Sequence, residues 1–190
     1  MIKMIYFTSD LHINHDREFI WKERGYKSVD EMNHALVDNI NSVVREKDTL
    51  YILGDVMLNK SKQKESIELL KSIICQDIHI IVGNHDTDER IKAYGSLQNV
   101  KEVCLAKRLK YGKYHLYLCH YPTMTGNLEA ESLTQVLICL YGHTHQNTNF
   151  YKDIPFIYHV GVDSHKGMPV EINEIIEEIK KKAEECKELL

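Results

Sequence analysis

The stretch Ile78–Asp86, which reads IHIIVGNHD, decides the fold. Four of its first five residues are β-branched aliphatics, which is the composition of a strand that is buried on both faces. The apolar run breaks at Gly83, and Asn84, His85 and Asp86 follow it directly. Ligands bind at the carboxyl ends of the strands in an open α/β sheet, so this stretch predicts a strand that carries polar side chains into a site.

The same design recurs in four other parts of the chain, where an apolar run ends in Asp or His. Asp10 and His12 lie two residues apart and so point to the same side of an extended chain, while Leu11 turns back toward the core. His143 and His145 repeat this spacing, and we expect each pair to chelate an ion. The four stretches are Met4–His12 (MIYFTSDLH), Thr49–Asp55 (TLYILGD), Tyr114–His120 (YHLYLCH) and Val136–His145 (VLICLYGHTH).

Helical segments separate the first three strands. Ser28 and Glu31 form an S-x-x-E capping box that opens one helix, and a second amphipathic helix covers Ser61–Ile74. Such alternation of strands and helices predicts parallel pairing. After the third strand the pattern changes, and Val100–Leu109 with Tyr114–Cys119 predicts an antiparallel hairpin. The remaining expected segments are a short helix over Asp88–Tyr94, a loop or short helix over Asn127–Thr134, a strand over Phe156–Val160 and a final helix over Glu171–Leu190.

Length and composition describe an ordinary globular chain. With 190 residues, of which 43% are hydrophobic and 27% charged, we expect a single domain over residues 1–190. The net charge of −4, without a basic block, argues against long nucleic acid as a partner. The five cysteines lack CxxC spacing, which is typical of free thiols in a reducing compartment. Without a signal peptide or an apolar run of about 18 residues, we expect a cytoplasmic protein with no membrane contact.

The strand ends together carry two carboxylates, one amide and four imidazoles. Seven such ligands exceed what one tetrahedral zinc ion takes, whereas they suit two octahedral ions that share a bridging carboxylate. A mixed oxygen and nitrogen set without thiolate favours Mn²⁺, Fe or Zn²⁺ and is too rich in imidazole for Ca²⁺. The candidate ligands are Asp10, His12, Asp55, Asn84, His120, His143 and His145. Gly54, just before Asp55, would let the backbone approach a ligand closely.

Two ions about 3.5–4 Å apart are an arrangement that cleaves phosphate esters by in-line displacement. A bridging water loses a proton and becomes the nucleophile, while the ions and imidazoles neutralise charge on the phosphate. The leaving alkoxide still needs a proton donor. His85 fits this role because it adjoins a candidate ligand and Asp86, a carboxylate that would orient the ring and favour imidazolium.

The motifs follow one another in the order Asp10-x-His12, Gly54-Asp55, Gly83-Asn84-His85-Asp86, His120 and Gly142-His143-x-His145. In this order, from residue 4 to about residue 163, they resemble the calcineurin-like metallophosphoesterases, in particular the small single-domain bacterial and phage-type members. The resemblance implies an α/β fold of two mixed β-sheets packed as a sandwich and flanked by helices, a four-layer αββα architecture. It also implies the ligand assignment: Asp10, His12 and His145 for one ion, Asn84, His120 and His143 for the other, Asp55 as the bridge, and His85 as the catalytic histidine with Asp86 behind it.

By the same resemblance the chain would be a dinuclear metal-dependent phosphoesterase that hydrolyses a small phosphodiester or phosphomonoester by attack of a metal-bridging hydroxide. We expect Mn²⁺, with Fe, Zn²⁺ and Ni²⁺ as alternatives, and we favour a phosphodiester, with a nucleotide as one candidate. Val56–Leu58 follow Asp55 without the later Asp and Arg of protein phosphatases, which disfavours phosphoprotein substrates. The alternative function is a catalytically silent scaffold of this fold that binds other proteins, although the full ligand set and His85 argue against it.

Overall fold

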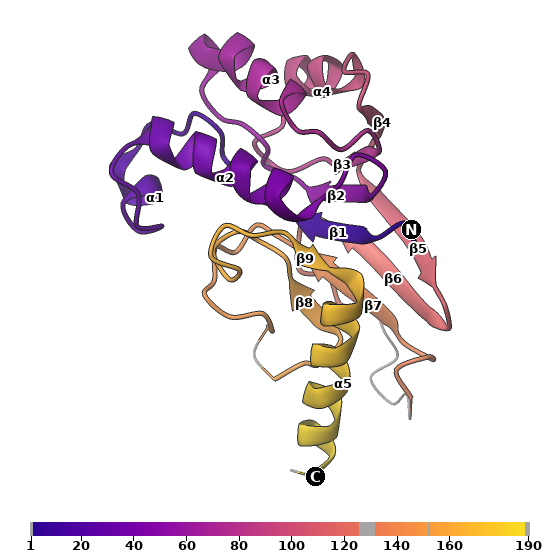
Figure 1. Ribbon diagram of the computed structural model, residues 1–190. Helices are drawn as coiled ribbons and strands as arrows, with labels where there is room; N and C mark the ends of the chain where they lie inside the picture. Colours follow the sequence, from indigo (N-terminus) through magenta and orange to yellow (C-terminus); the bar gives the residue numbers. More distant parts are fainter. Residues whose placement is uncertain (1, 126–131, 152, 189–190) are drawn as a thin grey trace.

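Two β-sheets packed face to face form the centre of the computed structural model, which describes residues 2–125, 132–151 and 153–188 (Figure 1). The first sheet has the strand order β4-β3-β2-β1-β9 and the second the order β5-β6-β7-β8. In the first sheet β1 (Ile5–Thr8), β2 (Thr49–Leu53), β3 (Ile78–Ile81) and β4 (Val100–Cys104) run parallel, and β9 (Val170–Glu171) is antiparallel to β1. In the second sheet β5 (Ala106–Tyr111) is antiparallel to β6 (Tyr114–Cys119), which is followed in parallel by β7 (Leu137–Tyr141) and β8 (Ile157–His159). The prediction of two mixed sheets with flanking helices is confirmed.

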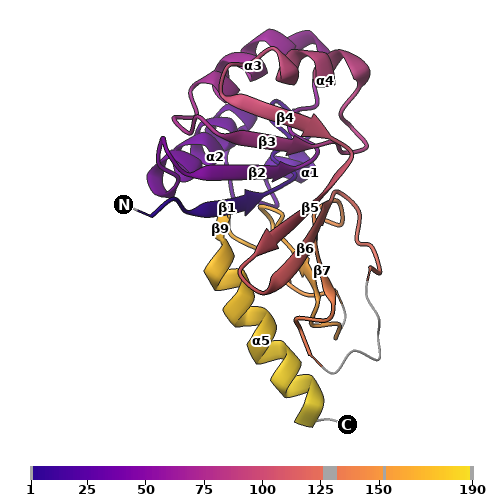
Figure 2. The same ribbon diagram turned by 90° about the vertical axis from the view of Figure 1, so that its right-hand side faces the viewer.

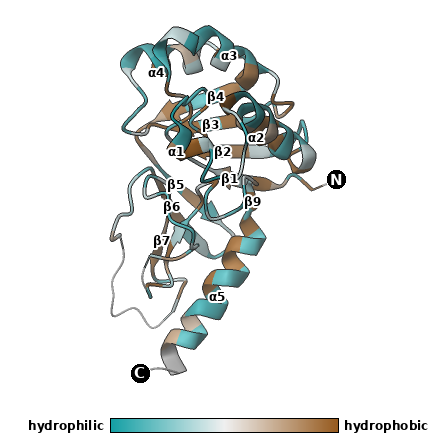
Figure 3. Cartoon of the chain, turned by 90° about the vertical axis from the view of Figure 1, so that its left-hand side faces the viewer, coloured by the Kyte–Doolittle hydropathy of each residue, from teal (hydrophilic) through white to brown (hydrophobic). Residues whose placement is uncertain are grey.

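Helices cover the face of the first sheet that points away from the second sheet (Figures 1 and 2). Leu50 and Ile52 of β2 face these helices, whereas Tyr51 and Leu53 face the second sheet. Because side chains alternate between the faces of a strand, a strand that is covered on both faces reads as one apolar run. Figure 3 shows this hydrophobic colour on the strands and hydrophilic colour on the outer helices. The helices are α2 (Val29–Val43), α3 (Gln63–Lys71) and α4 (Asp88–Gly95). The short helix α1 (Glu18–Trp21) precedes α2, and the 3₁₀ turn η1 (Lys60–Lys62) precedes α3.

The last helix, α5 (Ile172–Glu188), begins at β9 and runs alongside the second sheet (Figures 1 and 2). Its apolar stripe, which includes Ile172, Ile175 and Ile179, packs into the core that the two sheets share. On the other face of the second sheet, Cys139 and Tyr141 form a small cluster with neighbouring aromatic side chains. No helix among the described residues is both long and apolar enough to span a membrane.

Two local predictions can be compared with the structure, and a third cannot. The side chain of Ser28 caps α2, because its hydroxyl accepts a hydrogen bond from the Glu31 N–H at 3.1 Å. The hairpin of β5 and β6 is confirmed, with Tyr111 opposite Tyr114 at its turn. The loop or short helix expected over Asn127–Thr134 lies largely outside the described residues.

The strand predicted over Val100–Leu109 is wrong as a single element. The chain leaves the first sheet after Cys104 and enters the second at Ala106, and Leu105 between them is 77% exposed. β4 therefore extends the parallel sheet, and β5 alone pairs with β6. A strand of either sheet has the same two-residue periodicity, so the local sequence does not show at which residue the chain changes sheets.

Candidate metal centre

The candidate ligands lie on the loops that follow five strands, where the carboxyl ends of the two sheets meet. The first sheet contributes Asp10 and His12 after β1, Asp55 after β2, and Asn84 and His85 after β3. The second sheet contributes His120 after β6, and His143 and His145 after β7. The structure thus brings all the predicted site residues into one group.

Three of these residues form what we call the His145 cluster: Asp10, His12 and His145. The Nε2 atoms of His12 and His145 are 3.1 Å apart. Asp10 Oδ1 lies 3.9 Å from His12 Nε2 and 4.0 Å from His145 Nε2. The Asp10 and His12 side chains are buried, so this cluster has a fixed, desolvated base.

A second group, the Asn84 cluster, consists of Asn84, His120 and His143. The Asn84 Oδ1 atom lies 2.9 Å from His120 Nε2 and 2.8 Å from His143 Nδ1. Asp55 stands between the two clusters, with its Oδ2 atom 3.5 Å from His120 Nε2 and 3.7 Å from His12 Nε2. One carboxylate therefore faces both groups of ligands.

The hydrogen bonds of the imidazoles indicate that these groups converge on cations. His120 Nδ1 lies 2.8 Å from the Leu53 carbonyl oxygen, which can only accept, so Nδ1 donates to it and Nε2 is directed at Asn84 Oδ1, 2.9 Å away. His145 Nδ1 likewise donates to Asp163 at 2.9 Å, and its Nε2 atom faces His12 Nε2. Imidazole nitrogens and an amide oxygen, all of which can ligate a metal ion, thus converge at short distance, as they would around a divalent ion. The donor set fits the predicted metal ions.

The pKa values of two buried groups, His12 and Asp55, agree with this interpretation. Burial lowers the pKa of His12 well below its usual value of 6.5, so this ring is neutral near pH 7 and offers a lone pair. Burial raises the pKa of Asp55, but the hydrogen bond and charge of His120 outweigh this effect and lower the pKa to about 2. Asp55 is therefore an ionised carboxylate although only 2% of it is exposed.

The backbone of the site is unusual, and here one prediction is wrong. Asp10, His12, Asp55, His143 and His145 all have positive φ, between 47° and 70°. The extended backbone that was expected to align each i, i+2 pair is therefore absent at these positions, and His143 and His145 belong to different clusters. Positive φ is uncommon for residues other than glycine and is found at functional sites that the surrounding structure holds in place. Leu11 does point into the core, as predicted.

Two glycines provide the space in which the ligands pack. A Cβ atom at Gly142 would overlap the Ser9 side chain and the Asp10 carboxylate. A Cβ atom at Gly54 would overlap the His120 ring and the backbone of Gly83, and Gly54 also has φ of 89°. Gly54 was expected to make room for a bound ligand, but the space is occupied by the protein's own histidine.

Asp86 was predicted to lie behind His85, and the structure gives this carboxylate other partners. Its oxygens accept hydrogen bonds from the N–H groups of Asp55 (2.9 Å) and Gly83 (2.8 Å) and from the Tyr94 hydroxyl (2.8 Å). Asp86 thus holds the Asp55 backbone and does not orient the His85 ring. The His85 side chain is 47% exposed at the edge of the site, with Nε2 3.9 Å from Asp55 Oδ2.

Sequence reasoning missed two residues, Arg24 and Asp163. Asp163 follows β8 and accepts a hydrogen bond from His145, while Arg24 pairs with Asp163 through Nε at 2.8 Å. Asp163 could have been predicted in the same way as the ligands, because it is an acidic residue that follows an apolar strand. It is the last residue of the stretch Val160–Asp163. Arg24 could not have been predicted in this way, because it reaches the site with a long side chain from a loop.

A cavity of about 530 Å³ borders the His145 cluster. Phe19, Ile20 and Tyr26 contribute apolar and aromatic surface to its lining. His145 and Lys166 also line it, so one cavity joins a candidate ligand, a cation and apolar surface. Its volume is in the range of cavities that bind small molecules.

Comparison with known proteins places this site in a family. Residues 4–180 match the model of the calcineurin-like phosphoesterase superfamily domain, and the chain belongs to this superfamily. It is 32% identical to the uncharacterized protein MJ1445 of Methanocaldococcus jannaschii, over 95% of this chain and 93% of that protein. It is 25% identical to the gene 66 protein of Mycobacterium phage D29, over 92% of this chain and 96% of that protein. A protein of unknown function from Aquifex aeolicus, AQ665, has a similar fold, with a TM-score of 0.69, 23% identity and coverage of 93% of this chain and 99% of that chain.

Membership of this superfamily makes the chain a metal-dependent phosphoesterase, and therefore a hydrolase that uses divalent metal ions. Two sets of Asp and His side chains lie close enough together to hold such ions: Asp10, His12 and His145, and Asp10, Asp55 and His120.

Proposed function

We propose that the chain is a dinuclear phosphoesterase that hydrolyses a small phosphoester, with a phosphodiester preferred over a phosphomonoester. The observation that carries this proposal is the place of Asp55, whose Oδ2 atom faces His12 at 3.7 Å and His120 at 3.5 Å. A carboxylate between two sets of ligands is what two neighbouring ions require. Asp10, His12 and His145 would hold one ion, and Asn84, His120 and His143 would hold the other.

Bound divalent ions would supply an activated water and neutralise charge on the phosphate. The protein holds the ligands in advance, because Asp86 fixes the backbone of Asp55 and the Leu53 carbonyl fixes the His120 ring. Such preorganisation avoids reorganisation during the reaction and is a main source of rate enhancement.

His85 would donate a proton to the leaving oxygen of the ester. Its N–H donates to Asp55 Oδ1 at 2.9 Å, which fixes its backbone beside the centre, while its half-exposed ring can reach a substrate. A histidine is suited to this step because its ordinary pKa lies close to neutral pH.

The cavity beside His145 would receive the organic part of the substrate. Apolar surface from Phe19 and Tyr26 suits an aromatic group such as a nucleobase, and Lys166 could face an additional negative charge. Long nucleic acid remains excluded from the proposal, because the chain has a net charge of −4. We further propose Mn²⁺ as the ion, a single domain over residues 1–190 and a cytoplasmic location.

Hydrolysis of bis(p-nitrophenyl) phosphate, beside p-nitrophenyl phosphate, tests the proposed function in protein stripped of metal and then given Mn²⁺. We expect activity to return with Mn²⁺ and to be higher for the diester. His85→Ala should lower turnover by about 10²–10⁴-fold and leave Mn²⁺ binding unchanged. His34→Ala is the matched control, because His34 is an exposed histidine on α2. Stoichiometric Mn²⁺ binding without hydrolysis of either ester would contradict the proposal and support the scaffold function.

Phe19→Ala tests the role of the cavity. Loss of one aromatic contact of about 0.5–1.5 kcal/mol should raise KM for bis(p-nitrophenyl) phosphate by roughly 2- to 12-fold and leave kcat almost unchanged. Leu105→Ala, which alters an exposed apolar side chain outside the cavity lining, serves as control. Equal KM values for the two variants would place the organic group elsewhere.

A further inference from the structure

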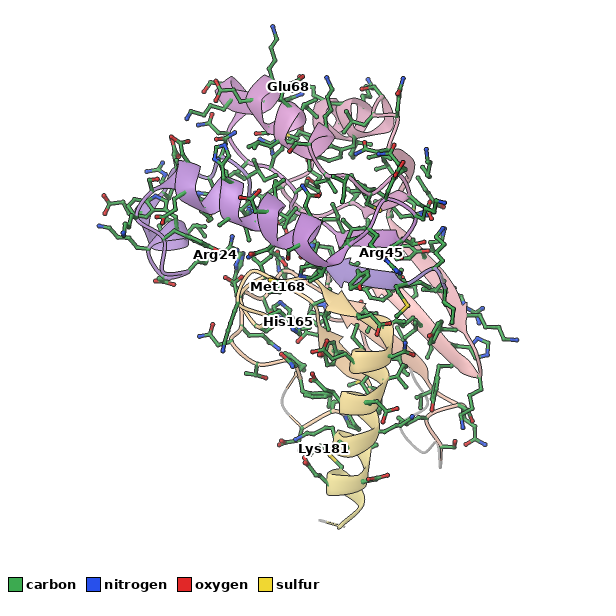
Figure 4. The ribbon with its side chains drawn as sticks, viewed as in Figure 1. Arg24, Arg45, Glu68, His165, Met168 and Lys181 are labelled. Atoms are coloured by element: carbon green, nitrogen blue, oxygen red, sulfur yellow. The ribbon has the colours of Figure 1, made fainter. Side chains whose placement is uncertain are left out.

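The Arg24 guanidinium makes an unusual set of contacts for a side chain that comes from a loop. It pairs with both oxygens of Asp163, from Nε to Oδ1 at 2.8 Å and from Nη2 to Oδ2 at 3.2 Å. Its side chain is 7% exposed and that of Asp163 is 12% exposed. Figure 4 shows Arg24 between the segment of α1 and α2 and the loop that carries His165 and Met168. The pair is therefore buried between two separate loops.

The same guanidinium also reaches the loop after β1. Nη2 donates to the Asp10 carbonyl oxygen at 2.8 Å, and Nη1 donates to the Leu11 carbonyl oxygen at 3.2 Å. These two peptide groups connect Asp10 to His12, whose backbone adopts positive φ at both residues. Arg24 thus satisfies the carbonyl groups of a strained turn that presents two candidate ligands.

Asp163 extends these contacts to the third member of the His145 cluster. Its Oδ2 atom accepts the hydrogen bond from His145 Nδ1 at 2.9 Å, and this bond directs the Nε2 atom toward His12. A carboxylate that accepts from the outer nitrogen of a ligating histidine fixes the orientation of the ring and strengthens the ligand. Arg24 is therefore connected to Asp10 through its carbonyl group, to His12 through the adjoining Leu11 carbonyl, and to His145 through Asp163.

The Asn84 cluster is held in a different way. His120 donates to a backbone carbonyl, that of Leu53, and the described residues include no carboxylate that accepts from the outer nitrogen of His143. The two clusters are linked by the Asp10 carboxylate, which accepts a hydrogen bond from the His143 N–H at 2.9 Å. Among the described residues, however, no hydrogen bond of Arg24 or Asp163 reaches the Asn84 cluster.

We propose that Arg24 and Asp163 are positioning residues that preassemble the His145 cluster and thereby set the affinity of one of the two metal ions. This inference rests on the proposed function, in which that cluster holds an ion. A guanidinium is suited to the role because its planar fork can bind a carboxylate with two nitrogens and donate to carbonyl oxygens at the same time. A lysine ammonium keeps the charge but cannot make this set of bonds.

Calorimetric titration of the metal-free protein with Mn²⁺ alone tests the inference without reference to activity. For wild type we expect two binding steps. Asp163→Asn and Arg24→Lys should each weaken one step by about 10- to 100-fold, the usual cost of losing a partner behind a ligand, and leave the other step unchanged. Two unaltered steps in both variants would overturn the inference. Absence of two-step binding in the wild type would instead overturn the dinuclear function, and this inference with it.

Arg45→Lys separates positioning from simple structural stabilisation. Arg45 also contacts both oxygens of one carboxylate, that of Asp48, at 2.9 and 2.8 Å, but at the amino end of β2, whereas Asp55 follows its carboxyl end. We expect Arg45→Lys to lower the unfolding temperature and leave both Mn²⁺ steps at their wild-type affinity. A change in either step as large as that in Arg24→Lys would show that the effect is not specific to the site.

A double-mutant comparison uses His145 itself. If Asp163 acts through His145, then Asp163→Asn should have no additional effect on Mn²⁺ binding once His145 is replaced by Ala. A further loss of 10-fold or more in that background would contradict the proposed route. The asparagine variant removes one charge and keeps the shape of the side chain, so it can be interpreted even if Arg24→Lys does not fold.

Discussion

The two clusters of the metal centre differ in what holds them. The His145 cluster is fixed by a buried network of charged side chains, which runs from Arg24 through Asp163 to His145. In the Asn84 cluster, His120 is held by a direct hydrogen bond to the carbonyl group of Leu53 at the end of β2. The His145 cluster therefore depends on an ion pair between two distant loops, whereas His120 of the Asn84 cluster is bonded directly to the end of a strand.

This difference has a consequence for metal binding. A ligand bonded to the end of a strand should be in place whenever the sheet is formed, whereas a cluster held by an ion pair between two loops requires those loops to be docked. We therefore expect the two ions to respond differently to changes around them. Changes at Asp55, which faces both clusters, should affect both ions together.

The largest effect is expected for Asp55→Asn. This change removes the charge that faces both His12 and His120, so both Mn²⁺ binding steps should weaken together. Hydrolysis of bis(p-nitrophenyl) phosphate should fall by more than about 10³-fold, the scale of losing an essential group. Asp38→Asn, an exposed carboxylate on α2, is the control. Loss of only one step would mean that Asp55 is not shared.

An intermediate effect is expected for alanine at two glycines, each of which adjoins one cluster. Gly142→Ala should displace the Asp10 carboxylate and weaken the ion of the His145 cluster, and Gly54→Ala should displace His120 and weaken the other ion. We expect about 10- to 100-fold in affinity for one step in each variant, measured by Mn²⁺ titration. Gly95→Ala is the matched control, because a Cβ atom there meets no other atom within 4 Å. If both glycine variants weakened the same step, the assignment of the clusters would be wrong.

The smallest effect is expected for Arg45 and Asp48, a charged pair outside the site. Its contribution to the free energy of unfolding shows how much a purely structural ion pair stabilises this protein. Hydrogen bonds from Arg45 lower the pKa of Asp48 to about 2. A depressed carboxyl pKa stabilises the folded protein fully above the unfolded value near 4, and this contribution is lost as the pH falls from about 4 to 2. Asp48→Asn should therefore lower the free energy of unfolding by about 1–2 kcal/mol at pH 7, given the partly exposed Arg45. The difference from wild type should shrink below pH 4; a difference independent of pH would exclude the charge as its cause.

Much of this site could be predicted because its residues lie where strands end. In Ile78–Asp86 an apolar run stops at a glycine and polar residues follow. The structure places Asn84 and His85 just beyond the carboxyl end of β3. The same reasoning located Asp10, Asp55 and His120. Parallel strands align their carboxyl ends, so positions that are distant in the sequence become neighbours in a foreseeable way.

What could not be predicted depends on the path of the backbone and on long-range contacts. The positive φ angles at Asp10 and His143 arise from the surrounding structure, and no local spacing reveals them. Arg24 reaches Asp163 across 139 positions of sequence, and Asp86 turns toward the backbone of Asp55 and not toward its neighbour His85. The change of sheet at Leu105 belongs to the same class, because both sheets use the same strand pattern.

The most direct test of the two-cluster account is anomalous X-ray diffraction from crystals of the wild-type protein grown with Mn²⁺. We predict two anomalous peaks about 3.5–4 Å apart, with Asp55 in contact with both. One peak should contact Asp10, His12 and His145, and the other Asn84, His120 and His143. A single peak, or two peaks that do not share Asp55, would contradict the account.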